Sequence, residues 1–222
     1  MKIFISRAQS DIFELLHYCK YRLWEDPIAL PLIETKSVPF TAPAHYDCIF
    51  FGSRRGVNHF LEKNQILTTA KIACAGPTTK KHLEDLGYQV AFYPSKSGDL
   101  KTAQKEFKDF VGASLTYFPA TRTSRGTYHE ELPKNQKVVQ DTYETKELPQ
   151  KIQDCDIYAF TSPSNYQAFI SANSFPENAF KVAWGGTTAD AMRKDKNDPE
   201  VELESSTTQA LVDALNKAFP ML

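Results

Sequence analysis

The sequence predicts an α/β protein with parallel sheets and helices on both faces of each sheet. Short apolar segments alternate with amphipathic helical segments along nearly all of the 222 residues, which is the pattern of βαβ units. The length suits one large domain or two small domains of about 100 residues each. In addition, junctions between strands and helices in the first half recur at a constant spacing in the second half. Together these observations predict two similar α/β lobes.

The first half begins with a strand at 2–6 and a helix over 11–22, for which Ser10 is the expected N-cap. A helix near 79–86 is expected to end at Gly87, because glycine accepts the left-handed backbone that often follows a helix. The other elements expected here are strands at 30–33, 47–51, 71–75 and 90–93 and a helix at 100–110.

The second half shows the same alternation, interrupted by one extended stretch rich in β-branched residues. The expected elements are a strand at 114–118, a helix near 128–132, the extended stretch at 137–144, a strand at 156–161, a helix from about 165, a strand at 180–184, a helix from about 188, a strand at 201–204 and a helix at 208–218. The segments 34–41 and 141–150 are the expected crossing points between lobes.

The composition excludes several classes of partner. Lys and Arg total 26 and Asp and Glu total 27, so the formal net charge is −1. Such a protein has no long-range attraction to nucleic acid or to an acidic membrane surface. We therefore expect neither partner, and any bound anion must be held by groups close to it.

The cysteines are scattered, with no CxxC pair and no nearby histidine that would suggest a metal site. Cys48 and Cys74 lie in apolar, strand-like segments, which predicts buried thiols. The N-terminal residues resemble a strand rather than a signal peptide, and no apolar segment approaches the ~20 residues that span a bilayer. These features predict a cytoplasmic, reduced protein without a metal.

Three strand-to-helix junctions of the first half recur in the second half. Each recurrence has the same spacing of 109 residues (162 − 53 = 109 for Ser53 and Ser162). Three matches in register, each after an apolar segment, indicate an internal duplication. The matched segments are Phe51-Gly52-Ser53 with Phe160-Thr161-Ser162, Gly76-Pro77-Thr78-Thr79 with Gly185-Gly186-Thr187-Thr188, and Ser97-Gly98-Asp99 with Ser206-Thr207-Thr208.

The chemistry of these junctions favours an anionic ligand. Ligands of open parallel sheets bind at the carboxyl ends of the strands. Helix starts there carry unpaired N–H groups and a partial positive charge, to which Ser and Thr add hydroxyl donors. If the lobes face each other, the junctions would converge on one cleft. Ordinary N-caps without a ligand are the competing interpretation of each single junction.

Known nucleotide-binding fingerprints are missing from the sequence. It contains neither GxGxxG nor GxxxxGK[ST], so no nucleotide cofactor is expected. The GxSxG motif of serine hydrolases is also absent.

The ordered set of motifs resembles the uroporphyrinogen-III synthase family along essentially the whole chain. The segments that carry the resemblance are Phe160-Thr161-Ser162-Pro163-Ser164, Ala75-Gly76-Pro77-Thr78-Thr79 with Leu86-Gly87, Tyr143-Glu144-Thr145, Tyr117–Arg122 with Arg125, and Thr207-Thr208-Gln209-Ala210-Leu211. The chain departs from the family pattern at Gly52, at Arg54-Arg55 and at Trp184-Gly185-Gly186.

The resemblance implies two flavodoxin-like or Rossmann-like lobes joined by a two-stranded β linker. Lobe one would contain residues 1–35 and 148–222, and lobe two residues 36–147. Periodicity alone would instead suggest a division near Gly112. Two lobes joined in this way are expected to hinge around a ligand.

The resemblance also implies the reaction. The family's substrate is hydroxymethylbilane, a linear tetrapyrrole with an acetate and a propionate on each ring. Loss of its hydroxyl as water leads to ring closure with the last ring, ring D, inverted, whereas the uncatalysed product is the uninverted isomer. The enzyme's main task is therefore to fold the chain correctly, which needs neither a cofactor nor a covalent intermediate.

One catalytic residue and a set of binding residues follow. Tyr143 matches the tyrosine of the family's Y-x-T segment, and a phenol, protonated at neutral pH, can help the hydroxyl to leave; a tyrosine that only packs locally is the alternative. Guanidinium groups and hydroxyls suit carboxylates. The expected substrate-binding residues are Ser53, Thr78, Ser162, Thr187, Thr188, Arg7 and Arg122.

Two other classes of function remain open at this point. One is a non-catalytic two-lobed binding protein for an anionic metabolite, and the other is an enzyme that acts on a phosphorylated or nucleotide substrate. The resemblance favours a monomeric, cytoplasmic synthase whose partner is its small-molecule substrate.

Overall fold

The computed structural model describes residues 1–95, 100–121 and 128–221. The chain forms two compact units, which are described one at a time. Unit 1 comprises Met1–Glu34 and Lys146–Leu222, and unit 2 comprises Thr35–Thr145. The chain passes from unit 1 into unit 2 within strand β3 (Ile33–Ser37) and returns within β7 (Lys137–Glu147).

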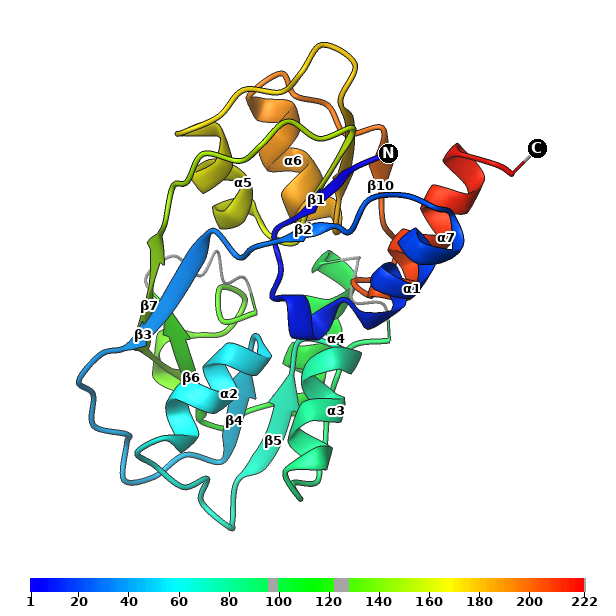
Figure 1. The fold of residues 1–222 in the computed structure, drawn as a ribbon. Helices are drawn as coiled ribbons and strands as arrows, with labels where there is room; N and C mark the ends of the chain where they lie inside the picture. Colours follow the sequence, from blue (N-terminus) through cyan, green and yellow to red (C-terminus); the bar gives the residue numbers. More distant parts are fainter. Residues whose placement is uncertain (96–99, 122–127, 222) are drawn as a thin grey trace. The chain divides into compact units, whose positions relative to one another are not determined.

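Unit 1 is built on a parallel sheet with the strand order β10-β9-β8-β1-β2 (Figure 1). Numbered along the chain within the unit, this is the order 2-1-3-4-5 of flavodoxin-like folds. The strands are β1 (Ile3–Ile5), β2 (Ile28–Ala29), β8 (Ile157–Phe160), β9 (Phe180–Ala183) and β10 (Val201–Glu202).

Helices cover both faces of this sheet. One face packs against α1 (Phe13–Tyr21), which follows the 3-10 turn Gln9–Asp11, and against α7 (Thr208–Ala218). The other face packs against α5 (Pro163–Ile170) and α6 (Gly186–Lys194). Since side chains alternate along a strand, β1 contributes to both cores.

Unit 2 has the strand order β3-β7-β6-β4-β5, and Phe92 extends it by an isolated parallel bridge to Ala73 of β5. Here β4 pairs in parallel with β5 and β6, and β6 with β7. The elements not yet given are β4 (Cys48–Phe51), β5 (Lys71–Cys74), β6 (Thr116–Thr121), α2 (Arg54–Leu61), α3 (Pro77–Asp85), α4 (Leu100–Val111) and a 3-10 turn at Lys134–Gln136. Helices α2 and α3 contribute to one core and α4 to the other.

The internal duplication is visible in the element bounds. Adding 109 to the bounds of β4, α2, β5 and α3 gives the bounds of β8, α5, β9 and α6 without any shift. The bridging residue Phe92 corresponds in the same way to Val201 of β10. The third matched junction includes 97–99, which lie outside the described residues.

Several sequence expectations need correction. Residues 128–132 form turns rather than a helix, because Pro133 follows too closely for a second helical turn. In the segment 90–93 only Phe92 forms a bridge, to Ala73. The single strand expected at 30–33 is replaced by two, β2, which ends at Ala29, and β3, which begins at Ile33. Ser10 lies within a 3-10 turn, so α1 starts after Ile12 without a side-chain cap.

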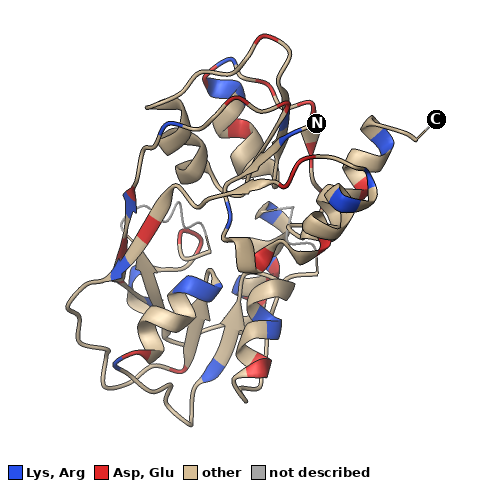
Figure 2. Cartoon of the chain, in the orientation of Figure 1, with Lys and Arg blue, Asp and Glu red and all other residues tan. Residues whose placement is uncertain are grey.

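Charged side chains avoid the centres of both sheets. Figure 2 shows β1, β4 and β8 without a charged residue, while both signs mix on the helices and loops. Within the described ranges, no helix is long and apolar enough to cross a membrane.

All four cysteines are buried free thiols, as predicted for Cys48 and Cys74. Burial raises the pKa of Cys48 to about 12 and that of Cys74 to about 11, above the ordinary value of 9.0.

We expect native cysteines to resist alkylation. The thiolate is the nucleophile, and a raised pKa together with burial removes it, so iodoacetamide at pH 8 should react much more slowly than in urea. The folded state also holds these protons more tightly than the unfolded state. The contribution of these protons to the free energy of unfolding should therefore be fully present below about pH 9 and be lost as the pH rises to 11 to 12. Mass spectrometry measures the alkylation rates, and thermal melts at several pH values measure the stability. Equal alkylation rates in the folded and the urea-unfolded protein would contradict the burial.

Candidate functional site

Each sheet has a switch point, where the chain order of its strands reverses. In unit 1 this point lies between β1 and β8, and in unit 2 between β4 and β6. Ligands of open α/β sheets bind outside the carboxyl ends of strands at such points. The residues that follow these strands are therefore the first candidates for binding.

In unit 1, hydroxyl and amide groups join the ends of β1 and β8. The backbone N–H of Thr161 donates to Ser6 Oγ at 2.9 Å, and Thr161 Oγ1 donates to the Ser6 carbonyl at 2.8 Å. Ser162 caps α5 by accepting from the Asn165 N–H at 3.3 Å. The fully buried Asn165 also donates its Nδ2 to Ser162 Oγ at 2.9 Å. The hydroxyls at this edge are thus held by a buried amide.

Arg7 follows β1 at the same edge. Its guanidinium lies 5.4 Å from the ring centroid of Trp184, at the end of β9, and its Nε lies 3.5 Å from an Asp11 carboxylate oxygen. The ring and the carboxylate hold the arginine at the ends of the strands. Its side chain is 20% exposed.

In unit 2, Ser53 follows β4 and caps α2 by accepting from the Gly56 N–H at 3.2 Å. Its Oγ lies 3.4 Å from the Tyr143 hydroxyl. The pairing of β6 with β7 shifts register beside Thr121, so Thr142 is an extra residue in β7 and both Thr142 and Tyr143 are buried. A bulge re-aims the side chains beside it. The structure therefore brings together Tyr143 and Ser53, two of the residues expected from the sequence.

The threonine pairs at the starts of α3 and α6 behave alike. Thr78 and Thr187 are exposed in the first turn of their helices, while Thr79 and Thr188 are buried. Thr188 also uses its backbone N–H to bind the Gly185 carbonyl at 3.0 Å. Hence Thr78 and Thr187 present hydroxyls to solvent, whereas the Thr188 side chain does not. The last residue expected to bind, Arg122, lies outside the described residues.

Sequence reasoning missed three residues of these edges. One of them is His59, which is buried and whose ring stacks on Tyr143 with centroids 4.8 Å apart. Asn165 and Gly56 occupy matching positions of the duplicated helices. The only sequence signal for them is the three-residue spacing of Ser53, Gly56 and His59, which no known motif singles out.

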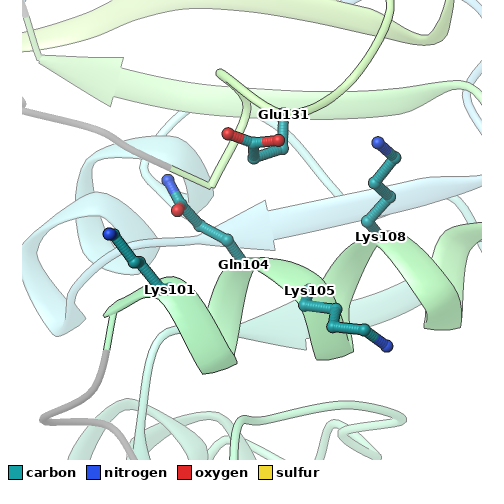
Figure 3. A pocket seen from close by; sticks show the side chains of 5 residues that line it. All are labelled: Lys101, Gln104, Lys105, Lys108 and Glu131. Atoms are coloured by element: carbon teal, nitrogen blue, oxygen red, sulfur yellow. The ribbon is translucent and has the colours of Figure 1, made fainter.

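A surface hollow of about 350 Å³ lies elsewhere in unit 2, on α4 (Figure 3). Its lining residues are Lys101, Gln104, Lys105, Lys108 and Glu131. The lysines and the glutamate are exposed, and Lys105 pairs with Asp109 at 2.8 Å. None of the described candidate residues lines this hollow, so it is separate from the strand-end sites.

Within the described part of the chain, no three His, Cys, Asp or Glu side chains gather as metal ligands would. The candidate sites consist instead of hydroxyls, amides, helix starts, one guanidinium and one phenol. Such groups can bind carboxylates and donate protons.

Comparison with known proteins gives two findings. Residues 22–213 match the family model described as "HEM4: Uroporphyrinogen-III synthase HemD". The fold is similar to the crystal structure of uroporphyrinogen-III synthetase from Helicobacter pylori 26695, with a TM-score of 0.72, 18% identity, and coverage of 98% of this chain and 99% of that chain.

A mutant uroporphyrinogen III synthase from the extremely thermophilic bacterium Thermus thermophilus is similar with a TM-score of 0.62, 13% identity and 98% coverage of both chains. No curated protein matches the chain in sequence.

At these identities the solved structures establish the fold, and the family model establishes the relationship. The match supports an enzyme over the non-catalytic binding protein that the sequence also allowed. Because the matched region covers most of the chain, the chain belongs to the uroporphyrinogen-III synthase family and is a cyclising lyase of tetrapyrrole biosynthesis.

Proposed function

We propose that the chain converts hydroxymethylbilane into uroporphyrinogen III with Tyr143 as its proton donor. The observation that carries this proposal is the approach of the Tyr143 hydroxyl to Ser53 Oγ, at 3.4 Å, where β4 ends and α2 begins. This places a phenol beside a helix start, which favours a carboxylate of the substrate.

In the proposed reaction, the phenol gives its proton to the departing hydroxyl of the substrate. The C–O bond breaks, water leaves, and an azafulvene cation conjugated with the first pyrrole remains. The terminal ring then attacks through its substituted carbon, and the resulting spiro intermediate rearranges so that ring D is inverted. The proton that the pyrrole loses after this rearrangement restores the phenol of Tyr143. The products are uroporphyrinogen III and water. Proton donation of this kind contributes about 10²- to 10⁴-fold in rate.

The remaining candidate residues would hold the carboxylates of the substrate. Ser162 and Thr187 of unit 1 and Ser53 and Thr78 of unit 2 add hydroxyls to helix starts, where N–H groups also point outward. Arg7 and Arg122 would add guanidinium groups. Thr188, although expected from the sequence, is left out of this set, because its hydroxyl is buried and its N–H binds the Gly185 carbonyl.

The decisive assay supplies hydroxymethylbilane, oxidises the products and separates the two isomers. We expect isomer III to predominate and the substrate to disappear faster than in buffer. Isomer I alone, formed at the rate of the buffer control, would rule out the synthase activity of this chain.

Replacing Thr187 by valine should raise KM about threefold to tenfold and change kcat less, because one hydrogen bond from a neutral hydroxyl to a substrate carboxylate is lost. Thr188→Val is the matched control at the next position, where the side chain is buried. An unchanged KM for Thr187→Val, measured by initial rates, would remove this hydroxyl from substrate binding.

We also propose that the enzyme acts in the cytoplasm as a monomer. The four free, buried thiols suit a reducing compartment. Light scattering coupled to gel filtration at assay concentrations tests the assembly state, and a mass near twice 25.1 kDa would contradict it.

A further inference from the structure

Helix α2 lines the side chain of Tyr143 with three residues spaced three apart. Ser53 lies 3.4 Å from the hydroxyl. A side chain on Gly56 would begin 3.8 Å from Cε1 of the ring. The His59 ring stacks on the phenol ring with centroids 4.8 Å apart and planes inclined by 15°. The helix thus contacts Tyr143 from its hydroxyl to the face of its ring.

His59 is itself fixed by hydrogen bonds to β3. Its Nδ1 lies 2.7 Å from Ser37 Oγ, and its Nε2 lies 2.8 Å from Thr35 Oγ1. A hydroxyl has one proton to donate, and that of Ser37 goes to Glu62, so Nδ1–H donates to Ser37 Oγ while the Thr35 hydroxyl can donate to Nε2. The imidazole cannot rotate or tilt without breaking one of these hydrogen bonds.

We propose that His59 is a positioning residue, whose ring holds the phenol of Tyr143 at the Ser53 end of the site. This inference rests on the proposed role of Tyr143 as proton donor. A donor must stay within hydrogen-bond reach of the departing group, and small displacements of a reacting group are costly. A fixed ring beneath the phenol removes the motions that would carry the hydroxyl away.

The duplicated helix provides an internal comparison. The residues of α5 that correspond to Ser53, Gly56 and His59 are Ser162, Asn165 and Ala168. The serine cap is kept, but the glycine and the histidine are not, and Ala168 is fully buried in the place of His59. A helix of this type therefore caps and packs without a histidine. In α2 the histidine is present, and there its ring stacks on Tyr143.

Two substitutions of His59 separate ring stacking from hydrogen bonding. His59→Phe keeps the ring face but loses the hydrogen bonds and should lower kcat about threefold, whereas His59→Gln keeps hydrogen-bonding groups but loses the ring and should lower kcat about tenfold or more, with KM within about threefold. A purely structural role of the buried hydrogen bonds predicts the opposite order, and that order would overturn the inference. His82→Gln is the matched control, since His82 lies on α3 and pairs with Asn58 Oδ1 at 2.6 Å.

A second variant guards against loss of folding at the buried position. Thr35→Val removes only the partner of Nε2 from a half-buried site, and it should lower kcat about threefold. The Tyr143→Phe background should abolish the effects of both Thr35→Val and His59→Gln on kcat, because the hydroxyl that they position is then absent.

The outcomes distinguish the inference from the proposal beneath it. If Tyr143→Phe alone leaves kcat unchanged, the proposed proton donor is wrong. If Tyr143→Phe slows the reaction while His59→Gln and Thr35→Val do not, Tyr143 stands and only the role of His59 is wrong. If His59→Gln lowers kcat equally in the wild-type and the Tyr143→Phe backgrounds, that role is also wrong.

Discussion

Replacing Tyr143 by phenylalanine is expected to lower kcat for isomer III about 100-fold or more while changing KM less than about threefold. The variant removes only the hydroxyl that lies 3.4 Å from Ser53 Oγ. The ring should keep its stack on His59 and its place in β7. Because uncatalysed closure continues at its own rate, the fraction of isomer I among the products should rise. Initial rates combined with separation of the isomers measure both effects.

Tyr117→Phe is the matched control for this prediction. Tyr117 lies on the neighbouring strand β6, where its hydroxyl donates to Gln140 Oε1 at 2.9 Å. The same chemical change there should leave kcat and the isomer ratio at wild-type values. If both variants lose activity to the same extent, the loss at Tyr143 reflects the packing of unit 2 rather than proton donation.

The duplicated part of the fold was the most predictable from the sequence. The strands β4 and β8 are apolar throughout, and each is followed by a small-residue turn and a serine that caps a helix. This local chemistry sets where a strand ends and a helix begins, so the spacing of 109 residues reproduces the element bounds. Where local signals were weak, as at 128–132 and 90–93, tertiary context and nearby prolines prevailed.

Most of the candidate binding residues were predictable because they lie at helix starts, whereas Tyr143 was expected from the family resemblance. Ser53, Ser162, Thr78 and Thr187 lie in such positions, because N-caps and first turns favour these residue types.

The burial of the next threonine, Thr188, depends on which face of α6 meets the sheet. The contact between Tyr143 and His59 depends on a bulge at Thr142 and on the packing of α2 against β7. Neither the bulge nor that packing has a signal in the local sequence.

Replacing Asn165 by alanine is expected to lower the free energy of unfolding by about 2–4 kcal/mol. Its Oδ1 accepts from the Leu32 N–H at 2.8 Å, and its Nδ2 donates to Ser162 Oγ at 2.9 Å. Both Asn165 and Leu32 are fully buried, so the truncation leaves a donor without a partner and opens a cavity. KM should also rise, because Ser162 Oγ loses the hydrogen bond from Asn165 that positions it. Urea unfolding and initial rates measure the two effects.

Asn173→Ala is the matched control, since Asn173 carries the same amide side chain in the same unit. Asn173 also accepts a backbone N–H, that of Ile152, at 2.8 Å, but it is only partly buried. Water can replace its side chain, so we expect a loss of about 1 kcal/mol. Equal losses for the two variants would show that water also reaches the Leu32 N–H. A larger loss at Asn165 would instead show that its buried hydrogen bonds to the Leu32 N–H and to Ser162 Oγ stabilise unit 1. In unit 2 the corresponding residue of α2 is Gly56, which has no side chain, and there Ser53 Oγ lies 3.4 Å from the Tyr143 hydroxyl instead.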